Sequence, residues 1–198
     1  MQYKSKISKD EINELEMLKF DGPIEVVTDV ERALEVAKLL ENESVLGFDT
    51  ETKPSFKKGE YYDISLLQLS TKTHIYLFRL NKFKFPKELA ELLSNKEIAK
   101  VGVAVRDDIK GLQKLQAFKD QSFFDLATKA KEIGVENFGL RALCAIFLGF
   151  RLSKKAKLSN WEQDTLTQAQ IHYAACDAWV GHEIYVRMES KDMEVCPV

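Results

Sequence analysis

The chain has 198 residues, of which 45% are hydrophobic and 30% are charged, and its net charge is −2. These values are typical of one globular domain, and no apolar stretch reaches the roughly 20 residues of a membrane-spanning helix. The small negative charge excludes a protein that coats nucleic acid through bulk positive charge. It leaves open a nucleic-acid partner held by a local basic surface or by bound cations.

The N-terminal residues "MQYKSKISKDE" are polar and lack the apolar region of a signal peptide, so we expect a cytoplasmic protein. Cys144, Cys176 and Cys196 are far apart and odd in number, which predicts buried or tail thiols rather than disulfides or a zinc site. No repeat or linker is evident. We expect a helical extension over 1–22, one domain over 23–190 and a tail over 191–198.

Two helices with similar start signals are predicted near the N-terminus. Ser8 is followed three residues later by Glu11, which is the capping-box pattern of a helix start. Thr28 and Glu31 repeat this pattern before an apolar periodicity that continues to about Leu40. The apolar run "IEVVT" (24–28), which lies between these helices, predicts a short strand.

Four further short apolar runs predict strands. They are "VLGFDTE" (45–51), "ISLLQLS" (64–70), "HIYLFRL" (74–80) and "IAKVGVAV" (98–105). A helix is predicted near 86–94, and from "FFDLATKAKEI" (123–133) onward the pattern is mostly helical. Early strands with helices between and after them predict an α/β fold in which helices cover both faces of a mixed sheet.

Two carboxylates stand at the end of the strand predicted over 45–51. Asp49 and Glu51 are two residues apart, so strand alternation places both side chains on one face, with Cα atoms roughly 6.5–7 Å apart. Anions this close to a core repel each other and lose water. Hydrogen bonds or a cation must offset that cost.

Further acids interrupt apolar patterns later in the chain. Asp107 and Asp108 follow the strand that ends near 105, where a helix cap would explain either one alone. Asp177 lies in a strongly helical stretch, four residues after Tyr173 and on the same helix face. Alone it would more often be a hydrogen-bonded core carboxylate. Together, the acids would supply oxygen ligands for two divalent cations that can act on a phosphodiester.

The motifs "FDTET", "VGVAVRDD" and "YAACD", with flanks such as "LLQLST" and "LSNWEQDTLTQAQ", resemble those of the DEDD 3′–5′ exonucleases. The similarity runs from about residue 24 to residue 188. It is greatest to the tyrosine subgroup, which includes the Werner syndrome exonuclease domain and ribonuclease D. It implies a single-domain ribonuclease H-like fold with a mixed five-stranded sheet flanked by helices. It also implies hydrolysis of the terminal phosphodiester at a 3′ end, with release of nucleoside 5′-monophosphates.

The resemblance assigns metal ligation to four acids. Three are expected to bind two Mg²⁺ or Mn²⁺ ions directly, namely Asp49, Glu51 and Asp177. Asp108 is expected to reach the second ion largely through water. It is preferred to Asp107 because the family has its acid at that offset after the Val-Gly strand.

Tyr173 is expected, by the same resemblance, to hold the attacking water. His172 is an alternative, because the histidine subgroup has its histidine five residues before the last aspartate. Adjacent side chains on a helix point about 100° apart, so only one of the two can face the metals. The flanking sequence favours Tyr173.

Residues near these motifs are candidates for contact with nucleic acid. "RLSKKAKLSNW" carries Lys154, Lys155 and Lys157, which we expect to bind phosphates, although a solvated loop is an equally good explanation. Gln68 is also expected to contact nucleic acid, because it matches a glutamine that recurs in the family. In the loop "TKPSFKKGEYYD" (52–63), the lysines could serve similarly and the aromatic residues could stack on the last base. Packing of a hairpin is the commoner use of such aromatic residues.

The expected partner is a single-stranded 3′ end of DNA or RNA, with no membrane involved. The sequence does not choose between these nucleic acids, so a ribonuclease D-like enzyme that trims RNA is one alternative. A non-catalytic binding module with the same fold is another. All four acid positions are filled, which favours an enzyme.

Overall fold

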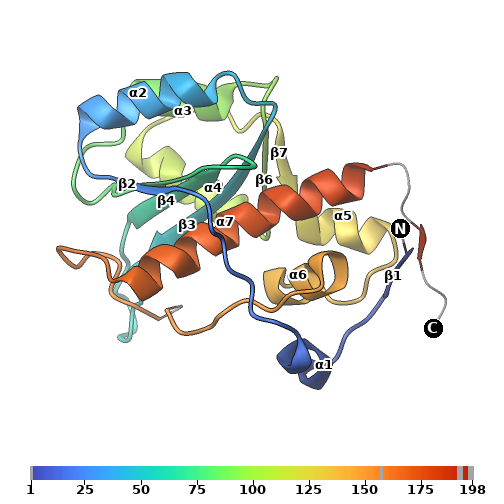
Figure 1. Ribbon diagram of the computed structural model, residues 1–198. Coiled ribbons are helices and arrows are strands. Elements are labelled where there is room, and N and C mark those ends of the chain that lie inside the picture. The colour runs from blue at the N-terminus through green and yellow to red at the C-terminus, as the bar shows by residue number, and fades with distance from the viewer. Residues whose placement is uncertain (1, 157, 191–193, 196–198) are drawn as a thin grey trace.

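The structure is a computed structural model, and it describes all residues except 1, 157, 191–193 and 196–198 (Figure 1). Its centre is a six-stranded sheet in the order β2-β5-β4-β3-β6-β7. Strand β4 is antiparallel to both of its neighbours, and the other pairs are parallel. The strands of this sheet are β2 (Ile24–Val27), β3 (Val45–Thr52), β4 (Ile64–Ser70), β5 (Ile75–Phe78), β6 (Ala99–Gly102) and β7 (Phe123–Asp125).

The expected number of five strands is therefore wrong. The sixth strand, β7, has three residues and pairs with β6 at the edge of the sheet, at Lys100↔Phe123 and Gly102↔Asp125. Sequence pattern assigned this segment to the helical region. Backbone pairing with β6 makes it a strand, and three residues are too few to show an alternating pattern of their own.

Helices cover both faces of the sheet, as Figure 1 shows. Helices α5, α6 and α7 lie on one face, and α2, α3 and α4 lie on the other. Strand β4 separates two apolar clusters, because Leu66 packs toward α7 whereas Leu67 and Leu69 pack toward α2 and α3. The helices are α1 (Lys9–Glu14), α2 (Val30–Leu40), α3 (Lys87–Ser94), α4 (Arg106–Leu115), α5 (Leu126–Glu132), α6 (Leu140–Leu148) and α7 (Gln168–Glu189).

The N-terminal segment packs onto this framework. Ser8 caps α1 in a complete capping box with Glu11, as predicted. The predicted cap of α2 is wrong by one residue. Asp29 takes this position, and its carboxylate accepts the backbone N–H of Arg32 at 2.8 Å. Ahead of α1, β1 (Gln2–Tyr3) pairs in parallel with β8 (Glu194–Val195).

The described cysteines, Cys144 and Cys176, are buried free thiols, as predicted. Burial raises their pKa values to about 12 and about 11, respectively, so both stay protonated at neutral pH. The prediction for Cys196 falls outside the described residues. Among the helices that the structure describes, none is both long enough and apolar enough to cross a bilayer.

Helix α7 lies directly against β3 because Gly47 has no side chain. A Cβ atom at this position would lie 2.0 Å from the carbonyl oxygen of Ala178 and 2.3 Å from Ser70 Oγ. Gly181, on the helix itself, allows a similar approach to β6, since a Cβ there would lie 3.0 Å from the carbonyl oxygen of Val101. Glycine at these two positions brings the helix onto β3, which carries Asp49, and onto the neighbouring strand β6.

Gly47→Ala is expected to lower the free energy of unfolding by about 2–3 kcal/mol, because the added methyl group forces α7 away from β3. For a chain of this size, the melting temperature should fall by about 4–12 °C. Thermal denaturation followed by circular dichroism measures the change. Gly139→Ala is the control, since its Cβ would have no neighbour within 4 Å. Equal melting temperatures for the two variants would contradict the close-packing explanation.

Candidate active site

Three carboxylates from two elements meet on the α7 side of the sheet. Leu46 and Phe48 of β3 pack toward α2 and α3, so strand alternation turns Asp49 and Glu51 toward α7. Helix α7 supplies the third carboxylate, Asp177. One ligand oxygen from each of the three residues lies within 4.8 Å of the others. The predicted convergence of these acids is confirmed.

The pKa of Asp49 is raised well above its ordinary value of 3.8. Burial is the main cause, followed by the negative charges of Asp177, Glu51 and Asp108. The backbone N–H of Thr50 donates to Asp49 Oδ1 at 2.9 Å and opposes this shift only in part. Closely spaced carboxylate oxygens are the ligands that hard divalent cations prefer, and a cation would remove the repulsion. The cluster therefore fits hard divalent cations.

Asp108 lies beside this group but is not one of its three members. It sits in the first turn of α4, where its carboxylate accepts a hydrogen bond from the hydroxyl of Thr50. Burial raises the pKa of Asp108. Asp107 instead faces solvent and pairs with Lys110 at 3.3 Å. The structure therefore supports the choice of Asp108, whose predicted contact with a second ion through water stays a prediction.

Tyr173 lies on the wall of the cavity that holds the acids. This cavity has a volume of about 330 Å³ and is also lined by Asp49, Glu51 and Asp177. Burial raises the pKa of Tyr173, and the nearby charges of Asp177 and Glu51 raise it further. Its phenol therefore keeps its proton at neutral pH. The ring packs against Trp161, with 6.2 Å between the ring centroids.

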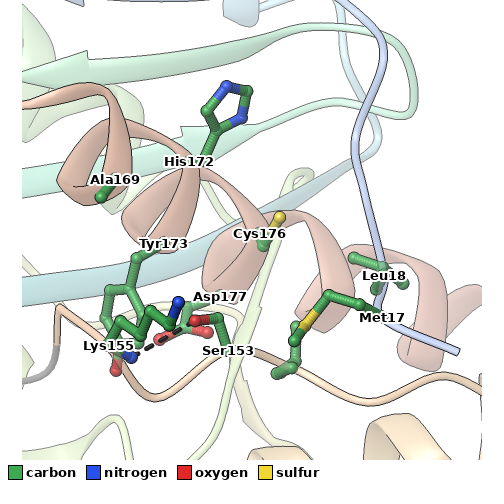
Figure 2. Close-up of a pocket in the computed structure, with 10 residues that line it drawn as sticks. Met17, Leu18, Ser153, Lys155, Ala169, His172, Tyr173, Cys176 and Asp177 are labelled. Atoms are coloured by element: carbon green, nitrogen blue, oxygen red, sulfur yellow. Dashed lines mark hydrogen bonds between the residues drawn. The ribbon is translucent and has the colours of Figure 1, made fainter. Parts of the chain in front are cut away.

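His172 takes the opposite direction on the same helix. Its side chain is exposed, and Figure 2 shows the imidazole ring directed away from Tyr173 and Asp177. It lines a cavity with Leu18 and Cys176 and borders the cavity of about 200 Å³ that reaches Tyr173 and Asp177, but not the one that holds Asp49 and Glu51. The geometry favours Tyr173 over His172 as the residue that faces the acids.

Two of the predicted phosphate-binding lysines border the acid site. Lys154 lines a cavity of about 410 Å³ that also reaches Tyr173 and Asp177. Lys155 lines a neighbouring cavity of about 200 Å³ that reaches the same two residues (Figure 2). Both lysines are exposed, which is compatible with binding. The prediction for Lys157 falls outside the described residues.

The structure corrects the prediction that Gln68 contacts nucleic acid. Its side chain is 0% exposed, because β4 is buried along its whole length in the middle of the sheet. Gln68 is the cross-strand partner of Asp49. Among the described residues, neither polar atom of its side chain has a hydrogen-bond partner. Gln68 therefore lies behind the acid site rather than on the binding surface.

Arg141 is a candidate that the sequence did not reveal. It lines the same cavity as Lys154, near Tyr173 and Asp177. Its Nε donates to the carbonyl oxygen of Leu152 at 3.3 Å. The sequence signal was weak, because a single cation in the apolar helix "GLRALCAIFLGF" could equally be a solvent-facing residue.

Comparison with known proteins gives one consistent family. A family model described as 3′–5′ exonuclease matches residues 24–191. The bifunctional 3′–5′ exonuclease/ATP-dependent helicase WRN of Mus musculus is 34% identical over 160 residues, which cover 78% of this chain and 11% of that protein. The chain spans 11% to 40% of the length of the first three curated relatives that it matches.

Solved structures agree with this result. The Aedes aegypti Nibbler EXO domain is 25% identical with a TM-score of 0.78, over 87% of this chain and 90% of that chain. Trypanosoma brucei RNase D, solved in complex with RNA U12, is 20% identical with a TM-score of 0.76, over 87% and 65%. At this identity the second likeness shows the fold alone. The predicted ribonuclease H-like fold is confirmed, with six strands rather than five.

Proposed function

Because this chain belongs to the 3′–5′ exonuclease family, we propose that it shortens a nucleic-acid strand from its 3′ end by a two-metal mechanism. Each hydrolysis of the terminal phosphodiester releases a nucleoside 5′-monophosphate. The observation that carries the proposal is the meeting of Asp49, Glu51 and Asp177 within 4.8 Å. These acids share a cavity with Tyr173.

The acid cluster serves to hold the cations and, through them, the scissile phosphate. Asp49, Glu51 and Asp177 are the direct ligands, and Asp108 acts through water in the orientation that the Thr50 hydroxyl gives it. When bound, Mg²⁺ or Mn²⁺ lowers the pKa of the attacking water and stabilises the charge on the leaving oxygen.

Tyr173 orients the attacking water rather than deprotonating it. Its raised pKa keeps the phenolic proton in place, so the hydroxyl can donate or accept one hydrogen bond in a fixed direction. Trp161 packs against the ring and holds it in position. A fixed water favours in-line attack on the terminal phosphodiester.

Tyr173→Phe is expected to lower the turnover rate by about 10²-fold, since a misplaced reacting group costs a factor of this size. The melting temperature should change little, because the ring and its packing remain. His172→Ala, the matched control, should cleave at close to the wild-type rate. Single-turnover cleavage of an end-labelled strand measures both. Loss of activity in the His172 variant with normal activity in the Tyr173 variant would reverse the assignment.

The test of the proposed function uses 5′-labelled single strands and recessed duplexes of both DNA and RNA, each with Mg²⁺, Mn²⁺ or EDTA. We expect a ladder of products that shortens one nucleotide at a time from the 3′ end and stops in EDTA. The preferred nucleic acid in the same panel separates a DNA-trimming enzyme from a ribonuclease D-like one. No metal-dependent shortening of any substrate would point to a non-catalytic binding module.

A further inference from the structure

Two aromatic side chains beside the acid site project into solvent. They belong to the loop of residues 53–63, which connects β3 to β4, and we call it the aromatic–basic loop. Phe56 is 81% exposed and Tyr61 is 91% exposed. The sequence made packing of a hairpin the commoner explanation for these residues, and the structure contradicts it for both. Large aromatic side chains that stay exposed mark an interaction surface.

The base of the loop is fixed in place. Lys53 Nζ lies 3.3 Å from Glu162 Oε2 and 4.5 Å from the centroid of the Tyr62 ring. The Tyr62 hydroxyl donates to Glu60 Oε2 at 3.4 Å. Tyr62 is half-buried, unlike Phe56 and Tyr61. These contacts hold the loop so that its exposed rings need little further ordering on binding.

The tip of the loop has its own turn. The backbone N–H of Glu60 donates to the carbonyl oxygen of Lys57 at 3.2 Å, and the hydroxyl of Ser55 donates to the same oxygen at 3.0 Å. Gly59 has a φ of +91°, which only glycine adopts readily. The turn presents Lys57 and Lys58, both exposed, and neither makes an ion pair with any residue that the structure describes.

The aromatic–basic loop is continuous with the acid site. It begins directly after β3, the strand that carries Asp49 and Glu51. Its anchor, Glu162, is adjacent to Trp161, which packs against Tyr173. In Figure 1, the loop between β3 and β4 lies at the same end of the molecule as the N-terminal end of α7. A strand whose 3′ end occupies the acid site would therefore have this loop beside it.

We propose that the aromatic–basic loop binds the unpaired segment next to the 3′ end of the substrate strand. Phe56 and Tyr61 stack on its bases, and Lys57 and Lys58 contact its phosphates. Exposed aromatic rings interleaved with free lysines are the combination that binds single-stranded nucleic acid regardless of sequence. Stacking needs an unpaired base, so the loop selects frayed or overhanging 3′ ends over fully paired ones. This inference rests on the proposed function.

The experiment pairs a change in the protein with a change in the substrate. Affinity for a short single-stranded oligonucleotide is measured by fluorescence anisotropy, with Ca²⁺ replacing Mg²⁺ to prevent turnover. Phe56→Ala/Tyr61→Ala should bind at least about fivefold more weakly for each stacked base that is lost. An abasic nucleotide placed in turn at each position near the 3′ end should weaken binding to the wild type at the stacked positions. The affinity of Phe56→Ala/Tyr61→Ala should not change when the abasic nucleotide is placed at these stacked positions.

Further variants separate charge and folding from stacking. Lys57→Ala/Lys58→Ala should reduce the slope of log affinity against log salt by about 1.4, that is, about 0.7 for each lost phosphate contact. Leu39→Ala/Val186→Ala removes two exposed apolar side chains on α2 and α7, 53% and 47% exposed, and should leave affinity unchanged. Melting temperatures confirm that all variants fold.

The outcomes distinguish the two proposals. If the wild type trims 3′ ends but the aromatic variant binds as tightly as the wild type, the loop does not hold the substrate and this inference is overturned. The inference is also overturned if Phe56→Ala/Tyr61→Ala binds more weakly but loses as much affinity as the wild type at every abasic position. In that case the loop affects the shape of the site and does not stack on bases. A wild type that neither binds nor trims any strand overturns the proposed function itself.

Discussion

Asp49→Asn is expected to lower the rate of 3′-end trimming by more than about 10³-fold, while it raises the thermal stability of the cation-free protein. The loss of rate follows because the amide is neutral and cannot replace a carboxylate as ligand. A bound cation supplies several kcal/mol of transition-state stabilisation, and each 1.36 kcal/mol is about tenfold in rate.

The gain in stability follows from the same carboxylate. Burial and the charges of Asp177, Glu51 and Asp108 oppose its ionised form in the folded state. The asparagine oxygen can still accept the N–H of Thr50, which now lies 2.9 Å from Asp49 Oδ1. We expect a gain of about 1 kcal/mol, typical of a stabilising substitution in an active site, or about 2–4 °C in melting temperature.

Initial rates on a labelled strand and thermal melts in EDTA measure these two effects. Asp107→Asn is the control, because Asp107 is exposed and pairs only with Lys110 among the described residues. It should change neither quantity appreciably. A fall in melting temperature for the Asp49 variant would show that the carboxylate stabilises the fold, against our account of the site.

Divalent cations are expected to stabilise the protein strongly near pH 8 and weakly near pH 5. The folded-state pKa of Asp49 lies above its ordinary value of 3.8, so between these two pKa values the folded state binds the extra proton. The free energy of unfolding of the cation-free protein therefore falls as pH rises through the folded-state pKa. Bound cations offset both causes of this fall, namely the burial of the Asp49 carboxylate and its repulsion by the neighbouring acids.

At a cation concentration about 100 times the dissociation constant, the gain is about 2.7 kcal/mol. For this chain length, that corresponds to a rise of about 5–11 °C in melting temperature. Thermal melts test this rise. They are recorded at both pH values with Mg²⁺, Mn²⁺ or EDTA, at matched ionic strength. Potassium chloride should not reproduce the shift. An equal shift at both pH values would mean that the cations bind elsewhere.

Much of the site could be predicted from the sequence because its parts carry strong local signals. Asp49 and Glu51 interrupt an apolar strand at a spacing of two, which fixes their common face. Asp177 and Tyr173 are one helical turn apart in a long helix. The strand at 64–70 was predicted with its observed bounds, because isoleucine and leucine dominate this short segment, as they do in a buried strand.

The remaining features depend on contacts between distant segments. Gln68 lies in that same buried strand, and only its position in the middle of the sheet shows that it cannot reach a ligand. Asp108 is held by Thr50, 58 residues away in the chain. The exposure of Phe56 and Tyr61 depends on how the loop is anchored to Glu162. None of these contacts leaves a periodic signal in the sequence.

Helix α7 crosses the sheet from β2 to β6 and buries Ala174, Val180 and Ile184 in the core. The same helix carries Tyr173 and Asp177, so the segment that completes the site is also one of the most firmly held. Amide hydrogens in its central turns should exchange with solvent only when the whole domain opens. Local opening elsewhere in the chain should therefore leave Asp177 and Tyr173 in place, and inactivation by heat should coincide with cooperative unfolding.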